Sequence, residues 1–182
     1  MSIPGSLTPL FNSGSSAAAG VPVEIERSLR FNSADSAFLS RTPAVAGNRR
    51  TFTWAGWVKR AYLGSNNKAL FSASASGTDY VDLRFESDGL RADFEASGQT
   101  RSQIITTAVF RDPSAWYHVV FAIDSTQGTA ADRVKIYING INQATSNTIN
   151  QNIDFAVNNT VAHSVGRRVY GSDNYLDGCL AE

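Results

Sequence analysis

Two carboxylates approach a catalytic spacing in residues 86–91, which read Glu-Ser-Asp-Gly-Leu-Arg. Carboxylates at alternate positions of one strand project from the same face, where one can act as nucleophile and another as acid in glycoside hydrolysis. The Glu-x-Asp-x-Glu and Glu-x-Asp-x-x-Glu patterns of such enzymes need a third carboxylate, but Leu90 or Arg91 stands at that position. Asp88 and Gly89 are common turn residues, so a turn explains this string better than catalysis.

The two histidines and the single cysteine do not predict a catalytic site either. We expect His118 to be hydrogen-bonded within a packed strand face, and His163 to lie in a loop or at a strand edge. Two histidines cannot form a metal triad without carboxylates. Cys179 excludes an intrachain disulfide, and we expect it to be a small buried residue of the last strand. The sequence therefore predicts that the protein is not an enzyme.

The residues around His118 belong to the clearest structural signal in the chain. Residues 116–124 and 134–138 are dense in β-branched and aromatic side chains, which predicts two adjacent antiparallel strands. In the second run, Val134, Ile136 and Ile138 share one face, the period expected for a strand with one buried side. Asn139 and Gly140 then favour the positive φ angles of a tight type I′ turn.

The rest of the chain repeats this pattern of short strands and polar turns. No segment keeps an amphipathic 3.6-residue period for three turns, so a β-sandwich or barrel is predicted. A hairpin turn is expected at residues 87–89, and one helical turn near residues 112–115. The expected strands are 27–32, 36–41, 51–60, 67–74, 79–87, 90–96, 102–110, 116–124, 132–139, 141–146, 160–167 and 174–181.

The charge pattern limits the partners. The 182 residues carry 16 basic and 16 acidic side chains, and no basic run exceeds two residues, which argues against nucleic acid as a ligand. The longest apolar stretches are too short to cross a bilayer, so no membrane insertion is expected. Residues 1–7 contain no basic region of a signal peptide, and no apolar stretch follows them.

Residues 1–24 form a separate segment rich in Ser, Gly, Ala and Pro. Such a segment has too little apolar area to offset its ordering entropy, which predicts a flexible linker or tail. The alternative is an anchor that becomes ordered on a neighbouring subunit. The candidate anchor residues are Ile3, Leu7, Leu10 and Phe11.

Residues 116–124 and 134–140 resemble laminin-G-like domains, which belong to the concanavalin A-like lectin family. The resemblance lies in a Trp-x-His-Val strand that ends in Asp, followed by Ile-Tyr-Ile-Asn-Gly. Further matches occur in the expected order at residues 52–59, 165–167 and 175–178. The resemblance covers roughly residues 27–182. It implies an all-β, two-sheet antiparallel jelly-roll sandwich over residues 25–182.

Glycan binding is the common use of this family, and the loop 167–175 has a suitable composition of aromatic and polar residues. Sugars offer apolar C–H faces and hydroxyl rims to such a loop. Alternatively, Tyr175 packs inside the sandwich and Arg167 covers an edge. The candidate glycan-binding residues are Arg168, Tyr170, Asp173 and Asn174.

The resemblance also implies that calcium can bind at the sandwich rim, through Asp oxygens and backbone carbonyls. No Asp-rich run has a recognisable ligand spacing, and each candidate can equally be a turn or strand-end residue. No other cofactor is expected. The calcium candidates are Asp79, Asp132 and Asp173, with Asp124 and Asp177 as further possibilities.

Residues 27–32 and 175–182 are most similar to the version of this domain found in bacteriophage structural proteins, including tail fibres. This similarity implies a virion protein, a tail fibre or a particle-decorating protein, that attaches to a host surface glycan or to neighbouring virion subunits. Virions assemble in the host cytoplasm, which fits a chain without an export signal or disulfides. The alternative is a carbohydrate-binding module of a bacterial surface adhesin or hydrolase.

Two expectations concern assembly. Fibres are commonly threefold, so a homotrimer that contacts other virion proteins is expected. Residues 175–182 alternate like a strand and stop without a turn signal, so we expect the natural chain to continue beyond Glu182.

Overall fold

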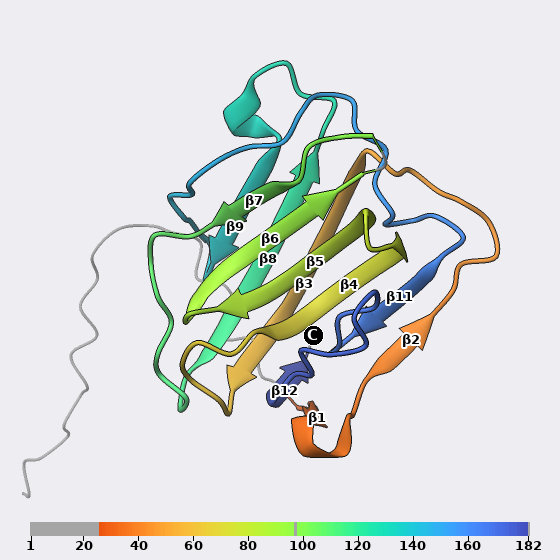
Figure 1. The fold of residues 1–182 in the computed structure, drawn as a ribbon. Helices are drawn as coiled ribbons and strands as arrows, with labels where there is room; N and C mark the ends of the chain where they lie inside the picture. The colour runs from red at the N-terminus through yellow and green to blue at the C-terminus, as the bar shows by residue number, and fades with distance from the viewer. Residues whose placement is uncertain (1–25, 97, 182) are drawn as a thin grey trace, which may run out of the picture.

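The computed structural model describes residues 26–96 and 98–181, which form two facing antiparallel sheets (Figure 1). Sheet A contains β1 (Leu29–Phe31), β12 (Gly178–Ala181), β3 (Thr51–Arg60), β8 (Trp116–Asp124), β9 (Val134–Ile138) and β10 (Ile141–Asn142), in that spatial order. Sheet B contains β2 (Leu39–Arg41), β11 (Ala162–Val165), β4 (Lys68–Ser76), β5 (Asp79–Glu86), β6 (Gly89–Glu95) and β7 (Ser102–Ile105), also in spatial order. The expected sandwich is confirmed, and each of the twelve expected strands has a counterpart, although β7, β10 and β12 are clearly shorter than predicted.

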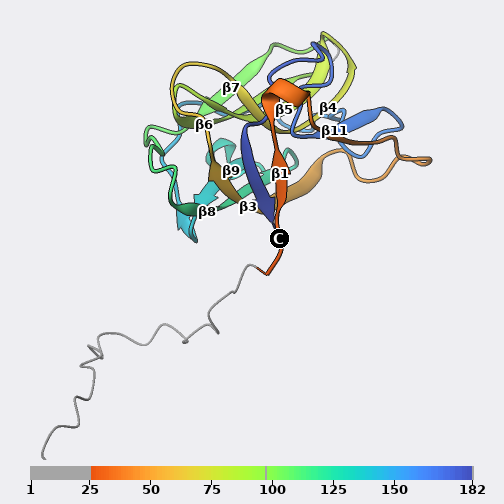
Figure 2. The same ribbon diagram turned by 90° about the horizontal axis from the view of Figure 1, so that it is seen from below.

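Sheet B lies in front of sheet A in Figure 1, and the view from below shows the two layers separated by the core (Figure 2). Side chains of β8 alternate between this core and the outer face. Val119, Phe121 and Ile123 are buried between the sheets, while His118 and Val120 on the outer face are half-buried. β5 alternates in the same way, with Leu83 and Phe85 in the core. Alternation thus gives each sheet one core face and one outer face.

Two tight turns have the backbone geometry that their residues predict. Asn139 and Gly140 have φ angles of 50° and 79° between β9 and β10, as a type I′ turn requires. Ser87 and Asp88 have φ angles of 49° and 67°, and they join β5 to β6 where Glu86 pairs with Gly89. Both hairpin turns are therefore confirmed.

Two local predictions are wrong. Residues 112–115 form no helical turn, because the Asp112 carboxylate accepts the Ser114 N–H in a side-chain turn immediately before β8. The short 3₁₀ helices lie instead at Ser33–Asp35 and Ala130–Asp132. Cys179 is half-exposed rather than buried, because strand alternation turns it away from the core side on which its neighbour Leu180 packs.

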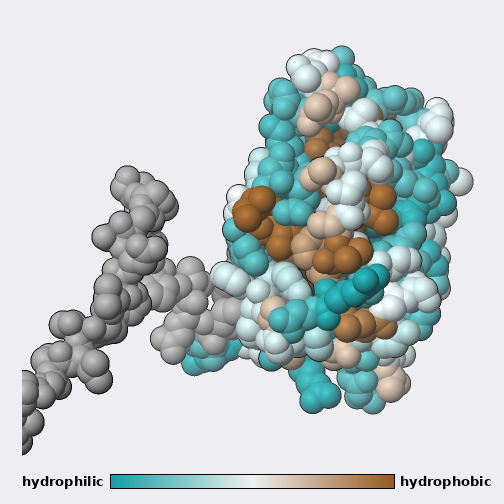
Figure 3. Space-filling view, turned by 90° about the vertical axis from the view of Figure 1, so that its left-hand side faces the viewer, coloured by the Kyte–Doolittle hydropathy of each residue, from teal (hydrophilic) through white to brown (hydrophobic). Residues whose placement is uncertain are grey.

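The expected anchor residues lie in residues 1–25, outside the described part of the chain. Within the described ranges, no helix is long and apolar enough to cross a membrane. On the side of the molecule shown in Figure 3, apolar residues reach the surface in small separate groups among polar ones. That side therefore shows no continuous apolar band.

Candidate glycan-binding site at the sandwich rim

The loop between β11 and β12 crosses the outer face of sheet B. The Val169 N–H donates to Ser72 Oγ of β4 at 3.3 Å, and the ring of Tyr170 lies 4.2 Å from that of Tyr80 of β5. Figure 1 shows this loop in front of β4. The loop therefore holds the predicted glycan-binding residues against the sheet.

Arg168, Tyr170 and Asp173 form a single cluster, as their closeness in sequence permits. Arg168 Nε donates to Asp173 Oδ1 at 2.6 Å, and a second guanidinium nitrogen donates to Asp173 Oδ2. A third donates to Tyr170 Oη at 3.1 Å, with the guanidinium 4.5 Å from the ring centre. Gly171 makes this pairing possible, because a Cβ there would lie 2.6 Å from Asp173 Oδ1 and 2.7 Å from Arg168 Nη2.

Beneath this cluster, β5 and β6 carry buried charges on the outer face of sheet B. Arg84 donates to Asp82 at 2.7 Å, to Glu86 at 2.7 Å and to Asp93 at 3.1 Å. The side chains of Asp82 and Asp93 are fully buried. Arg101 also pairs with Asp93. These side chains, with Arg91 bonded to Glu86, form an ion-pair network in which every charge has an opposite partner.

The two buried aspartates of this network have opposite pKa shifts. Burial raises the pKa of Asp82 to about 6 although Arg84 acts to lower it, and Asp82 Oδ1 has no hydrogen-bond partner in the described structure. Burial also acts on Asp93, but the guanidinium groups of Arg101 and Arg84 outweigh it and lower the Asp93 pKa. The ionised form of Asp93 is therefore favoured by the fold, whereas burial disfavours the ionised form of Asp82.

Asn174 and Tyr175 lie apart from the Arg168 cluster, at a hollow of about 430 Å³ on the rim. We call this the rim hollow. Its residues come from the turn after β1, the β3–β4 loop, the start of β4 and the β11–β12 loop. They are Ser33, Ser65, Asn66, Asn67, Lys68, Asn174 and Tyr175. Three amides, two hydroxyls, an ammonium and a phenol thus meet at one site.

The polar side chains of the rim hollow make few hydrogen bonds or ion pairs with the rest of the described structure. Nδ2 of Asn174 is buried and has no acceptor among the described residues, while the Asn174 carbonyl accepts the Ala69 N–H at 2.8 Å. The ammonium of Lys68 lies 4.9 Å from the centre of the Tyr62 ring, and no ion pair of Lys68 occurs in the described ranges. The donors that the hollow presents to a polar ligand therefore come from the accessible side chains of Ser65, Asn66 and Asn67, and the positive charge comes from Lys68.

Tyr175 and Arg167 also have structural roles. The centre of the Tyr175 ring lies 6.3 Å from the centre of the Phe38 ring. The guanidinium of Arg167 lies 3.7 Å from the centre of the Phe38 ring. Tyr175 therefore packs against the fold and lines the rim hollow at once. Tyr175 therefore lies at the rim, against the exposed Phe38, rather than inside the sandwich, and Arg167 covers the ring of Phe38.

A second concave surface lies on the outer face of sheet A. Trp57, Trp116, His118 and Asn139 line a hollow of about 480 Å³, which we call the aromatic shelf. The centre of the His118 ring lies 5.1 Å from the centre of the Trp57 ring. The backbone N–H of His118 donates to Asn139 Oδ1 at 2.8 Å. His118 is thus held on an outer face rather than inside a packed one. Alternation along β8 puts Trp116 and His118 on one face, and the register between β3 and β8 places Trp57 opposite His118.

The carboxylate string at residues 86–91 has structural partners. Asp88 is buried and accepts from Arg60 at 2.9 Å, from Arg111 at 2.9 Å and from the Gly64 N–H at 2.8 Å. Burial acts to raise the pKa of Asp88, but these hydrogen bonds outweigh it and lower the pKa to about 2. Asp88 thereby fixes the β3–β4 loop, which supplies the amides of the rim hollow.

The calcium candidates are not brought together. Asp132 pairs with Lys135 at 2.9 Å and Asp173 pairs with Arg168, while Asp79 begins β5. Burial raises the pKa of Asp79, and its Oδ1 has no hydrogen-bond partner in the described structure. Over residues 26–96 and 98–181, no group of three or more His, Cys, Asp or Glu side chains is placed to hold a metal ion.

With this geometry established, the chain can be placed in a family. Residues 32–182 match the laminin-G-type model described as the concanavalin A-like lectin/glucanases superfamily, so the chain belongs to that superfamily. Similar solved structures include a carbohydrate-binding module, CBM40, of the Ruminococcus gnavus IT-sialidase. It is 15% identical, with 74% of this chain and 77% of that one covered, at a TM-score of 0.55.

Two further structures extend the comparison. Domains LG4-5 of the mouse laminin α1 chain are 13% identical, with 95% of this chain and 45% of that one covered, at a TM-score of 0.61. Domain 4 of the arabinanase AbnA from Geobacillus stearothermophilus, solved with arabinotriose, is 18% identical, with 76% and 60% covered, at a TM-score of 0.55. The chain thus spans less than two thirds of both. Among curated proteins, the sequence finds no match.

At these identities the solved structures establish the fold alone. One of them is named as a carbohydrate-binding module, and another was solved in complex with arabinotriose. The family and the jelly-roll sandwich that it implies are therefore confirmed.

Proposed function

We propose that this chain is the carbohydrate-binding domain of a bacteriophage virion protein, a tail fibre or particle-decorating protein that attaches to a host surface polysaccharide. The rim hollow is the observation that carries the binding proposal. Its amides and hydroxyls suit sugar hydroxyl groups, and the ring of Tyr175 offers an apolar face. Membership of a lectin superfamily supports the same chemistry.

The charge of the rim hollow suggests which sugars fit. Lys68 contributes the positive charge, and no carboxylate lines the hollow. An anionic sugar gains a charge-assisted hydrogen bond from Lys68 that a neutral sugar cannot make. We therefore propose an acidic surface polysaccharide as the ligand class.

The virion part of the proposal rests on sequence similarity at residues 27–32 and 175–182. In the proposal, the protein assembles in the host cytoplasm as a homotrimer, and residues 1–24 anchor it to other virion proteins. The aromatic shelf supports a second role for the domain, which is contact with another subunit. It presents two partly exposed tryptophans on one sheet face, and tryptophan is enriched at protein–protein interfaces. Binding glycan and packing against a subunit then use different faces.

A glycan array tests the binding proposal. The wild-type domain should bind acidic polysaccharides saturably, and Lys68→Gln should lose that binding. Lys135→Gln is the matched control, since Lys135 lies on the outer face of sheet A. An inert array, or equal binding by the Lys68→Gln variant, would contradict the rim hollow as the site.

A separate experiment addresses the alternative of a carbohydrate-binding module on an adhesin or hydrolase. In assembled particles, the virion proposal predicts that residues 1–24 are ordered against another virion protein. The alternative predicts a flexible tether that connects to a bacterial surface protein or enzyme. Electron microscopy of purified particles, labelled with an antibody to this domain, distinguishes the two.

A further inference from the structure

Arg167, near the start of the β11–β12 loop, carries a positive charge that the fold does not neutralise. Its neighbour Arg168 is paired with Asp173, but no carboxylate pairs with Arg167 in residues 26–96 and 98–181. Its Nε atom is buried and has no acceptor among the same residues, while the side chain as a whole is only half-buried. Arg167 can therefore offer the terminal nitrogens of its guanidinium to a ligand.

Two aromatic rings connect Arg167 to the rim hollow. The guanidinium lies 3.7 Å from the centre of the Phe38 ring, and that centre lies 6.3 Å from the centre of the Tyr175 ring. Tyr175 and Lys68 both line the rim hollow. Phe38 is 38% exposed, so this region reaches the surface. The rim thus has one cation in the hollow and a second cation at Phe38, and Tyr175 lies against both regions.

The second cation is held in place before any ligand binds. The guanidinium contacts the Phe38 ring in a cation–π arrangement. The Gly166 N–H donates to the Leu70 carbonyl at 3.0 Å, and the Gly166 carbonyl accepts the Leu176 N–H at 2.8 Å. The residues next to Arg167 and Tyr175 are therefore bonded to each other, which fixes the two side chains on one piece of backbone. A side chain that is already ordered loses less entropy when it binds.

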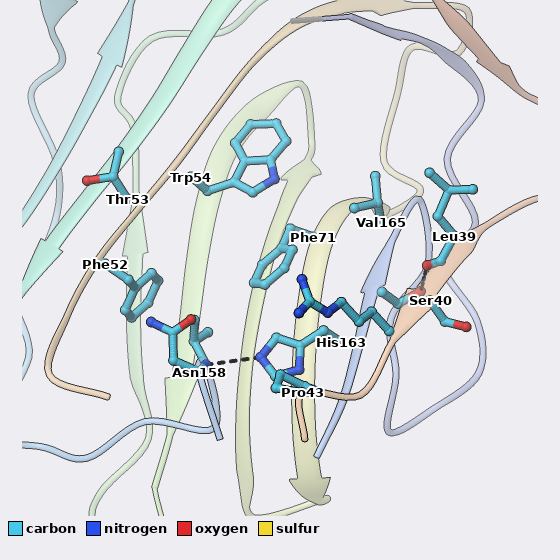
Figure 4. Close-up of a pocket in the computed structure, with 13 residues that line it drawn as sticks. Leu39, Ser40, Pro43, Phe52, Thr53, Trp54, Phe71, Asn158, His163 and Val165 are labelled. Atoms are coloured by element: carbon cyan, nitrogen blue, oxygen red, sulfur yellow. Dashed lines mark hydrogen bonds between the residues drawn. The ribbon is translucent and has the colours of Figure 1, made fainter. Parts of the chain in front are cut away.

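The cleft between the two sheets has different chemistry. Phe52, Trp54 and Phe71 line this cleft of about 540 Å³, and Figure 4 shows their rings facing it. His163 also lines it, but its Nε2 accepts the Asn158 N–H at 3.0 Å and its Nδ1 lies 2.8 Å from a backbone carbonyl. A charged and hydrated sugar chain would lose solvation in such an apolar cleft. The cation at Phe38 is the better continuation of the rim hollow.

We propose that Arg167 forms a second, carboxylate-binding subsite for the polysaccharide held in the rim hollow, an inference that rests on the proposed function. Lys68 binds one acidic residue of the sugar chain. The planar fork of Arg167 makes paired hydrogen bonds to the carboxylate of another residue of the same chain. The ligand class is then narrower than an acidic glycan, because the polysaccharide must carry carboxylates on more than one residue. Polyuronates and polysialic acids have this property.

Calorimetric titration tests the subsite, with oligomers of alginate, polygalacturonate, hyaluronan and polysialic acid as probes. For the oligomer that wild type binds best, Arg167→Gln should weaken the Kd about tenfold. Arg167→Lys keeps the charge but not the fork, and it should weaken the Kd by less. Arg41→Gln is the matched control, because Arg41 is an exposed arginine of β2 that lines the cleft between the sheets instead. It should leave the Kd within about twofold of wild type.

The Nε–H signal of Arg167 in NMR spectra of the wild-type chain gives a readout that a purely structural role would not move. It should shift when the oligomer saturates the protein, while the Nε–H signal of Arg168, which is bonded to Asp173, should stay in place. This measurement needs no variant, so it holds even if Arg167→Gln does not fold. An unmoved Arg167 signal at saturation, or wild-type affinity in a folded Arg167→Gln variant, would overturn the subsite and leave the rim hollow standing. If no oligomer binds the wild-type chain, the subsite and the proposed function both fail.

Discussion

The β11–β12 loop contains two regions that use their polar groups in opposite ways. Arg168, Tyr170 and Asp173 bond to one another and cover buried charges of sheet B. Asn174 and Tyr175, the next residues, line a rim hollow where an amide nitrogen and an ammonium group have no hydrogen-bonded or ionic partner in the described structure. Composition made the whole loop a candidate for glycan binding, but pairing separates a structural half from a half that lines the rim hollow, where a ligand reaches the buried amide nitrogen of Asn174 only if that side chain moves.

The largest effect should come from the buried network under the structural half. Arg84→Met removes the ion-pair partner of the buried Asp82, while Asp93 keeps Arg91 and Arg101, and this should lower the free energy of unfolding by about 3 to 5 kcal/mol. Chemical denaturation measures the loss. Arg111→Ala, at a side chain that is 66% exposed, is the control and should cost less than about 1 kcal/mol. Equal losses for both variants would mean that the network is not structural.

Asp88 connects the interior to the rim hollow, and it should make the domain sensitive to acid. Its pKa is lowered to about 2 in the folded state, below the ordinary value of 3.8 for an aspartate side chain. Its stabilising contribution is therefore present above about pH 4 and is lost as pH falls toward 2. Asp88→Asn should cost about 1.5 to 3 kcal/mol at neutral pH and flatten the fall in stability between pH 4 and 2. Denaturation curves across this range test the sign, and an unchanged slope would contradict it.

Substitutions in the rim hollow should affect binding more than folding. Asn174 has a φ of 54°, so Asn174→Gly removes the amide without straining the backbone. We expect about a tenfold weaker Kd for the bound glycan, equivalent to about 1.4 kcal/mol. Asn142→Ala, at an exposed amide in β10, is the control. Calorimetric titration gives both constants, and a melting temperature confirms that folding is intact.

The smallest effect is expected from the exposed part of the structural half. Arg168→Gln breaks a half-buried ion pair and should cost about 0.5 to 1 kcal/mol of stability. Glycan affinity should stay within twofold of wild type, because Arg168 does not line the rim hollow. A large loss of binding without a loss of stability would place the site at the Arg168 cluster instead.

Much of the fold could be predicted from local patterns. Alternation in residues 134–138 and the Asn139–Gly140 turn specified a hairpin, because side-chain period and φ preference are properties of short segments. The helical turn at residues 112–115 failed because the Asp112 side chain competed for the Ser114 N–H. The prediction for Cys179 failed because the sequence does not tell which face of β12, a strand paired between β1 and β3, meets the core.

The site was less predictable because it depends on register and distant loops. Asn174 was a candidate by composition, but Ser33, Asn66 and Lys68 join it only through the topology. The aromatic shelf needs the pairing of Trp57 with His118 across β3 and β8. A run of amides at residues 66–67 was the one local signal that could have indicated the rim hollow.

The central claim is that a ligand binds at the rim hollow. NMR chemical-shift mapping with the acidic glycan that scores highest on the array tests it directly. The account predicts shifts concentrated at Ser65, Asn66, Lys68, Asn174 and Tyr175, with the amides of Arg168 and Trp116 unmoved. Shifts concentrated at the Arg168 cluster or at the aromatic shelf, with the rim hollow silent, would contradict it.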